Sequence, residues 1–397
     1  MNNSLKQRSL ALHKKHHGKI EVSSKIRVEN SDDLALAYSP GVAEPCLKIK
    51  DNYEDIYKYT AKGNMIAIVT DGSAVLGLGN IGAHASLPVM EGKAILFKEF
   101  GGVDAFPICL NTQDPEEVIK IVKNISPSFG GINLEDISAP NCILIERRLK
   151  KELDIPVFHD DQHGTAIVTI AALINACRLT NKPLEDLEIV LSGTGAAGSS
   201  IARLLKDIGV KKLYAYNLKG VMTKIKYNDY SFSEKELIDE GIISFPAKLQ
   251  NDSLKALIRD KDVFIGVSSK NLLTKDMVKS MHKNPFIFAM ANPEPEISVE
   301  DALGGGAYIV GTGRSDYPNQ INNVLAFPGL FRGALDSKTT KITESMKLQA
   351  AKAIAYLLNS EELSPSYIIP SPFDKRVAKV VAKAVSDEVT RLKIYRK

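Results

Sequence analysis

The chain has 397 residues, of which 44% are hydrophobic and 25% are charged, and its formal net charge is +4. This composition is ordinary for a globular protein of two or three domains, and it excludes a disordered chain, a collagen and a coiled coil. So small a charge excess gives no reason to expect a nucleic-acid partner. The longest mainly apolar stretch, residues 166–177, is shorter than the roughly 20 residues of a membrane span, so no membrane partner is expected.

The first part of the chain alternates predicted strands with predicted helices. A short helix is expected to end at Tyr38, before a Ser-Pro-Gly turn. Strands are predicted at residues 65–70, 103–110 and 130–137 and at the start of 155–166, and helices at 91–100, 114–129 and 142–153. Such alternation favours a parallel or mostly parallel α/β sheet.

A second block is predicted to begin near Asp161. It opens with a helix at 164–180, followed by a strand, a glycine loop, a helix and a strand over 187–220. Residues 223–236 lack a regular period and are interpreted as a surface insertion. Further strands are predicted within 261–269, 284–296 and 306–329, and the chain is expected to be mostly helical from Ser337 onward, with a proline-rich break at 364–374.

The four cysteines and the N-terminus indicate a cytoplasmic protein. Cys46, Cys109, Cys142 and Cys177 form no CxxC pair, so reduced, mostly buried thiols are expected rather than a zinc site or disulfides. The N-terminus has no apolar core of signal-peptide length. Its basic cluster at residues 14–19 could bind a polyanion, but it is interpreted as a solvated helix end.

A GxGxxG pattern predicts dinucleotide binding in the second block. The pattern follows the predicted strand at 187–191 and precedes the predicted helix at 199–208, which is the context that supports it. The glycines permit a tight turn, and the helix N-terminus attracts a pyrophosphate. The residues of the pattern are Gly193, Thr194, Gly195, Ala196, Ala197 and Gly198.

The residue that usually binds the adenosine ribose differs from the common pattern. An acid is expected about 20 residues after the glycines, but the strand at 213–216 is followed by Asn217, with Lys219 two residues further on. An amide does not repel a 2′-phosphate, and Lys219 could attract one. The sequence therefore predicts that NADP is accepted at least comparably with NAD, unless Lys219 points to solvent.

Two acid clusters follow predicted strands. Glu135 and Asp136 end one segment, and Asp160 and Asp161 end the other. Carboxylates converging at the carboxyl edge of a sheet suit Mg²⁺ or Mn²⁺. The alternative is helix capping by Asp136 and Asp161, although two clusters of one kind favour a metal.

Several nearby side chains have both a catalytic and a structural interpretation. His159 and His163 flank the acids, and structural or supporting roles are favoured over metal ligation. Lys93 lies among apolar neighbours after a glycine-rich loop, and burial would lower its pKa toward that of a base; on composition alone, a surface lysine fits better. Tyr38 is more often a packing residue than an acid.

Three amides also follow predicted strands, namely Asn292, Asn322 and Asn323. They could bind a nicotinamide amide or a substrate carboxylate, and a turn-forming role is equally compatible.

The ordered motifs over about residues 30–335 resemble the malic enzymes, in the small bacterial form. The matching segments are AYSPGVAEPC, TDGSAVLGLGNIG, VMEGKAILFK, INLEDI, FHDDQHGTA, GTGAAG, ANPEPE and NNVLAFPG. The resemblance implies an α/β protein with an N-terminal malic domain for substrate and metal (1–160) and a C-terminal Rossmann-type NAD(P)-binding domain with a helical C-terminus (161–397). It also implies a homodimer, in which Tyr38 and Lys93 of one site could come from neighbouring subunits.

The activity that the resemblance implies is oxidative decarboxylation of (S)-malate to pyruvate and CO₂, with reduction of NAD or NADP and with Mg²⁺ or Mn²⁺. Lys93 would be the general base and Tyr38 the general acid, with Asp160 beside Lys93. The remaining implied roles are metal ligation by Glu135, Asp136 and Asp161, and contact with substrate or nicotinamide by Asn292, Asn322 and Asn323.

One position departs from the larger eukaryotic relatives, which carry an arginine where Ala74 stands here. Carboxylate binding by that arginine, and the allostery of those relatives, therefore do not carry over. Two other functions stay open: a malolactic enzyme, which would retain NAD and release lactate, and a non-catalytic Rossmann redox sensor, which would not need Lys93 and the acids together.

Overall fold

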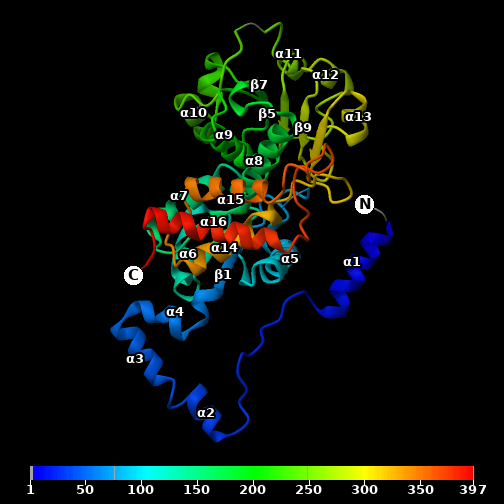
Figure 1. The fold of residues 1–397 in the computed structure, drawn as a ribbon. Coiled ribbons are helices and arrows are strands. Elements are labelled where there is room, and N and C mark those ends of the chain that lie inside the picture. Colours follow the sequence, from blue (N-terminus) through cyan, green and yellow to red (C-terminus); the bar gives the residue numbers. More distant parts are fainter. Residues whose placement is uncertain (1–2, 76, 248, 397) are drawn as a thin grey trace.

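The computed structural model describes residues 3–75, 77–247 and 249–396. It is an α/β protein with two separate sheets, one of four strands and one of six. Figure 1 shows the six-stranded sheet and its helices at one end of the molecule and the four-stranded sheet with α5, α6 and α7 in the middle. Within the described residues, no helix is long and apolar enough to cross a membrane.

The first sheet has the strand order β2-β1-β3-β4, and all its strands are parallel. In β1, Ile66 and Ile68 face the core shared with α5, whereas Ala67 and Val69 face the core shared with α6 and α7. Both faces are covered, so the strand is apolar throughout rather than alternating. The bounds are β1 (Met65–Thr70), β2 (Asp104–Cys109), β3 (Gly131–Leu134), β4 (Val157–His159), α5 (Gly82–Gly101), α6 (Pro115–Ile125) and α7 (Asn141–Glu152).

The second sheet has the strand order β10-β9-β8-β5-β6-β7, and only the short edge strand β7 is antiparallel. Its strands and helices alternate as the sequence predicts for a Rossmann-type fold. The strands are β5 (Glu188–Ser192), β6 (Lys212–Asn217), β7 (Gly220–Val221), β8 (Val263–Gly266), β9 (Phe286–Ala289) and β10 (Ile309–Thr312). The helices are α9 (Ala196–Asp207), α10 (Phe232–Asp239), α11 (Leu254–Ile258), α12 (Lys275–Lys279) and α13 (Val299–Gly304).

Residues 223–236, expected to be a surface insertion without a regular period, contain helical elements. A 3₁₀ helix occupies Lys224–Asp229, and α10 then begins at Phe232. Helix α10 starts with a capping box formed by Ser231 and Glu234, and Leu237 is completely buried. A helix of only eight residues shows little periodicity in sequence, so its local capping rather than its pattern defines it.

The long helix α8 and the C-terminal helices connect the two sheets. Helix α14 packs on α5 of the first sheet, where the ring of Phe97 contacts Phe327 at 4.6 Å and Phe331 at 5.4 Å between centroids. Although they follow the second sheet in the chain, α14 and α16 thus lie beside the first one (Figure 1). The domain boundary predicted at 160/161 lies between the two sheets. It places α14 and α16 in the second domain, although both helices pack beside the first sheet. Their bounds are α8 (Asp160–Thr180), α14 (Phe327–Asp336), α15 (Glu344–Tyr356) and α16 (Arg376–Leu392).

The N-terminal segment forms an arm that extends away from the body (Figure 1). It contains α1 (Asn3–His16), α2 (Ser31–Ala37), α3 (Ala43–Asp51) and α4 (Ile56–Tyr59). No side chain of residues 4–61 is buried. Apolar side chains such as Val22 and Leu36 are 87% and 71% exposed, which is unusual for a folded segment and characteristic of a surface that another molecule covers.

Candidate active site

The two predicted acid clusters meet at the carboxyl edge of the first sheet. Glu135 and Asp136 follow β3, while Asp161 lies in the first turn of α8, directly after β4. Because β3 and β4 are parallel neighbours, their ends lie side by side. Each of these three residues offers one carboxylate oxygen, and the three oxygens lie within 4.8 Å of one another.

This group of carboxylates fits a hard divalent cation. Its donors are all oxygens, as Mg²⁺ and Mn²⁺ prefer, and no cysteine or histidine belongs to it. The backbone N–H of Asp136, held at a φ of 53°, donates to Asp161 Oδ2 at 2.8 Å. The amide of Asn133 donates to Glu135 Oε2 at 2.8 Å. These bonds orient two of the three carboxylates toward a common point.

Helix capping does not explain Asp136. The N-cap of α7 is Pro140, and no side chain caps that helix end. Asp161 lies in the first turn of α8, where a negative charge is favourable, but its side chain accepts a hydrogen bond from Asp136 rather than from its own helix.

Lys93 lies in the middle of these acids. Its Nζ is 2.7 Å from Glu135 Oε1 and 2.7 Å from Asp160 Oδ2, and it lies 4.3 Å from the ring centroid of Phe327. The lysine is 8% exposed, so it is not the surface lysine that composition favoured. Burial alone would lower its pKa, but the charges of Asp160 and Glu135 outweigh burial and raise the pKa. The expectation that the pKa of Lys93 is lowered is therefore wrong for the protein residues alone, without a bound cation.

The carboxylates around Lys93 are short of positive charge. Burial raises the pKa of Glu135 and of Asp160 to about 7 and that of Asp161 to about 6, although Lys93 lowers each of them. One ammonium therefore does not fully compensate these three acids, and an added cation would be electrostatically favourable here.

Loops of the second sheet complete the site. Asn323, beyond β10, donates from Nδ2 to Asp160 Oδ2 at 2.5 Å. Asn322 instead caps the following 3₁₀ helix, because its Oδ1 accepts from the Val324 N–H at 2.9 Å. Asn292 follows β9, and its side-chain amide packs against Gly313. A Cβ atom added to Gly313 would lie only 2.7 Å from Asn292 Nδ2. Of the three amides, Asn323 is the one that contacts the acids.

Neither histidine belongs to the group of ligand atoms. His163 Nε2 lies 2.9 Å from Glu146 Oε2, and its Nδ1 lies 2.9 Å from Lys347 Nζ. The ring of His159 is completely buried, and its nitrogens have no hydrogen-bond partner among the described residues. Burial lowers the pKa of both histidines to about 4, so both are neutral. Because the group of ligand atoms contains neither ring, a structural role for the two histidines stays the prediction.

The GxGxxG segment has the geometry that a dinucleotide requires. The loop follows β5, and α9 begins at Ala196 with no side chain capping its N-terminus. A Cβ on Gly198 would lie 1.9 Å from the Gly193 carbonyl oxygen, so the turn excludes any other residue there. A Cβ on Gly195 would meet nothing within 4 Å, so space remains in front of the helix N-terminus for a pyrophosphate.

Tyr38 is the one predicted catalytic residue that lies away from the rest. It caps the C-terminus of α2 in the arm and is 70% exposed. Figure 1 shows α2 at the tip of the arm, on the far side from the loops that follow the second sheet. Within one chain, the structure does not bring Tyr38 to Lys93.

Three residues that contact predicted site residues were not identified from the sequence. Glu146 and Lys347 are buried beside His163, and Glu234 lies at the glycine loop. A lone acid or lysine on an amphipathic helix carries no signal of burial. The Ser231–Glu234 capping box was recognisable, but it predicts a helix start rather than a contact with Thr194.

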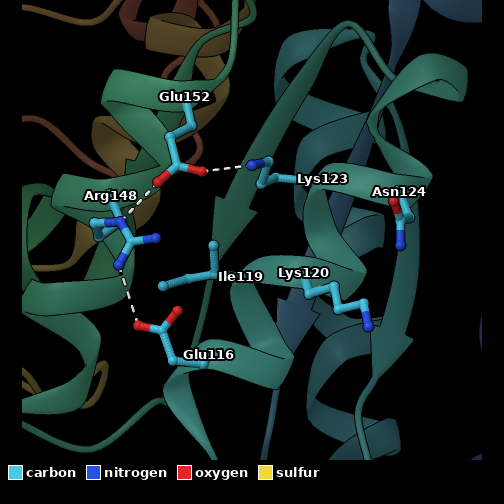
Figure 2. A pocket seen from close by; sticks show the side chains of 7 residues that line it. All are labelled: Glu116, Ile119, Lys120, Lys123, Asn124, Arg148 and Glu152. Atoms are coloured by element: carbon cyan, nitrogen blue, oxygen red, sulfur yellow. Dashed lines mark hydrogen bonds and ion pairs between the residues drawn. The ribbon is translucent and has the colours of Figure 1, made fainter.

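A surface pocket of about 210 Å³ lies elsewhere, between α6 and α7 (Figure 2). Two of its cations are paired with its acids: Lys123 with Glu152 at 2.5 Å, and Arg148 with Glu116 at 3.1 Å. None of the predicted site residues lines this pocket, so it is separate from the site above.

The Rossmann-type sheet with its glycine loop, next to a sheet edge that carries a buried lysine and converging carboxylates, defines a dinucleotide-dependent oxidoreductase. A family model of the malic enzyme N-terminal domain matches residues 17–150, and one of the malic enzyme NAD-binding domain matches residues 162–391. The chain belongs to the malic enzyme family.

Individual relatives agree with this assignment. The chain is 57% identical to the bifunctional malic/malolactic enzyme of Bacillus subtilis, over 96% of this chain and 92% of that one. It is 45% identical to the NADP-dependent malic enzyme of Escherichia coli, of which it spans 52%. Among solved structures, the NAD-dependent malic enzyme of Thermotoga maritima superimposes with a TM-score of 0.90 at 47% identity, over 95% of this chain and 98% of that one.

Proposed function

We propose that the protein catalyses oxidative decarboxylation of (S)-malate to pyruvate and CO₂, with reduction of NAD or NADP, and that it depends on Mg²⁺ or Mn²⁺. The observation that carries this proposal is Lys93, held 2.7 Å from both Glu135 and Asp160 where the loops of the two sheets meet. A proton acceptor, a group of metal-type ligands and a nucleotide-binding loop are all needed for this reaction. A non-catalytic redox sensor would need only the loop.

With a cation bound at the carboxylates, the charges that raise the pKa of Lys93 would be offset, which favours its neutral amine. This amine takes the proton of the C2 hydroxyl as the hydride leaves C2 for the nicotinamide. Asp160 holds the lysine in place, and Asn323 in turn fixes Asp160 from the second sheet. When bound by Glu135, Asp136 and Asp161, the cation supplies positive charge that polarises the substrate oxygens and offsets the carboxylates around Lys93. Oxidation at C2 gives a β-keto acid, which loses its C4 carboxylate as CO₂ and keeps the electron pair of the broken C3–C4 bond as the enolate of pyruvate. Tyr38 then protonates C3 of this enolate to give pyruvate.

Tyr38 reaches this site from a second copy of the chain. The arm that carries it buries none of its side chains over residues 4–61, and Tyr38 itself is 70% exposed. A twofold pair that exchanges arms would cover these apolar side chains and place each tyrosine in the partner's site. The proposed active unit is therefore a homodimer.

The overall reaction is tested by following NADH and NADPH formation from (S)-malate with and without Mn²⁺. We expect pyruvate and reduced nucleotide in equal amounts, and loss of both when EDTA removes the metal. Unchanged turnover in EDTA would contradict the proposed metal site.

The shared site is tested by mixing two inactive variants, Tyr38→Phe and Lys93→Ala, under conditions that let subunits exchange. Random pairing leaves one intact site in each mixed dimer, so about a quarter of wild-type activity should return. If both residues came from one chain, mixing would restore nothing.

A second function, the malolactic reaction, is supported by one observation. The relative in Bacillus subtilis that is 57% identical is named a bifunctional malic/malolactic enzyme. If the reduced nucleotide stayed bound and reduced pyruvate, lactate would form with no net NADH. Measuring lactate, pyruvate and NADH in the same reaction separates the two outcomes.

A further inference from the structure

The sequence lacks an acidic residue at the end of β6, where Asn217 stands, but helix α10 brings a carboxylate, that of Glu234, to this place. Glu234, in the first turn of α10, accepts from the Thr194 hydroxyl at 2.5 Å and from the Asn217 amide at 2.7 Å, both through Oε1. Its other oxygen, Oε2, accepts from the Ser231 N–H and from the Ser231 hydroxyl, both at 2.9 Å. The four bonds hold the side chain at the point where the glycine loop and the end of β6 meet.

This point is where Rossmann-type domains bind the adenosine ribose. In such domains an acid at the end of the second strand bonds the ribose hydroxyls, while the preceding glycine loop holds the pyrophosphate. Here the second strand is β6, which ends at Asn217. Glu234 contacts Asn217 and also Thr194 of the glycine loop, so its carboxylate occupies the place of the missing acid.

The negative charge of Glu234 is not neutralised by a neighbouring cation. Among the described residues, Glu234 takes part in no ion pair. Lys219 is exposed, and its Nζ lies 5.9 Å from the ring centroid of Tyr230. The amide of Asn217 is also engaged, because Nδ2 donates to Glu234 and Oδ1 accepts from the Lys219 N–H. The two residues that suggested a phosphate site therefore do not form one.

We propose that Glu234 determines the nucleotide specificity of the protein: its carboxylate exchanges the hydrogen bond from the Thr194 hydroxyl for one from the adenosine 2′-hydroxyl and repels a 2′-phosphate, so that NAD is preferred over NADP. This proposal rests on the proposed dinucleotide-dependent function and makes it more specific. It reverses the expectation drawn from Asn217 and Lys219, because a neutral residue at the end of β6 does not leave the ribose site neutral.

The test measures nucleotide binding rather than turnover. The dissociation constants of NADH and NADPH are obtained for the full chain by fluorescence titration, without malate or metal. Wild-type protein should bind NADH about tenfold or more tightly than NADPH, since juxtaposed like charges are strongly unfavourable. Glu234→Gln, which keeps the shape but removes the charge, should reduce this ratio by about tenfold, mainly through tighter NADPH binding.

A matched control is available two residues further along the same helix. Glu236 is bonded by Arg147 at 2.6 Å and by Arg203 at 2.8 Å, and residues two apart on a helix do not face the same way. Glu236→Gln should leave the NADH/NADPH ratio unchanged. Glu234→Ser is a second variant with the charge removed, should Glu234→Gln fold poorly.

Two results would overturn the proposal. One is wild-type protein that binds NADPH as tightly as NADH or more tightly. The other is an unchanged ratio in a folded Glu234 variant that still binds both nucleotides. If wild-type protein bound neither nucleotide, the proposed function itself would fail, which distinguishes that failure from an error about Glu234 alone.

Discussion

Binding of Mn²⁺ should raise the thermal stability of the protein, and Asp136→Asn should remove most of that increase. A ligand that binds only the folded state at about 100 times its dissociation constant stabilises that state by about 2.7 kcal/mol. The unfolding entropy of a chain of 397 residues is roughly 0.8 kcal/mol per kelvin, at about 2.1 cal/mol/K per residue. The expected increase in Tm is therefore about 3 °C.

The substitution affects this increase through the metal affinity. Loss of one of three carboxylate ligands should weaken binding by at least the roughly 10- to 100-fold that is typical of losing a supporting group. At the same Mn²⁺ concentration, the stabilisation then falls to about 0.4–1.4 kcal/mol, which corresponds to an increase of less than about 2 °C. Without metal, Asp136→Asn should be no less stable than wild type, because it removes one of several crowded negative charges.

Differential scanning fluorimetry across a Mn²⁺ titration measures both effects without any assay of turnover. The exposed acid Glu116, which lies outside the cluster, provides the matched control, and Glu116→Gln should show the full metal-dependent increase in Tm. An equal increase in wild type and Asp136→Asn, at a Mn²⁺ concentration of about 100 times the wild-type dissociation constant, would refute the assignment of Asp136 as a ligand.

Three further predictions concern Lys93, Phe331 and Lys347. Lys93→Ala should reduce kcat for malate oxidation by roughly 10²-fold or more, while NADH titration should show unchanged nucleotide affinity; near-normal turnover would exclude Lys93 as the base. Phe331 is completely buried, and Phe331→Ala should reduce the free energy of unfolding, measured by chemical denaturation, by about 3–5 kcal/mol. Phe373 is 81% exposed, and the control Phe373→Ala should reduce it by less than about 0.5 kcal/mol. Burial lowers the pKa of Lys347 to about 8 from its usual 10.5, so its charged form costs stability below pH 8 and this cost disappears as the pH rises past 10.5. Lys347→Met should therefore be more favourable at pH 7 than at pH 10 by about 2.5 kcal/mol. Equal effects at both pH values would contradict a buried charge.

Local features of the sequence were sufficient to predict the two α/β units and the elements that carry chemistry. The apolar run that forms β1 and the glycine pattern between β5 and α9 were both identifiable, because buried parallel strands and phosphate-binding turns require residue types that few other structures tolerate. The acids after β3 and β4 were recognisable for the same reason, since the ends of parallel strands lie at one edge whatever the rest of the fold. These inferences depend on neighbours close in the chain.

The tertiary structure alone decided which charges share one environment. Burial of Lys93 was expected to lower its pKa, but the sign of the shift depends on Glu135 and Asp160, which are 42 and 67 positions away in the chain. The end of β6 was predicted to be neutral from Asn217, but Asn217 donates a hydrogen bond to the carboxylate of Glu234, on a helix that begins within the segment interpreted as a surface insertion. Coulomb interactions depend on distance in space, and a sequence pattern records only separation along the chain.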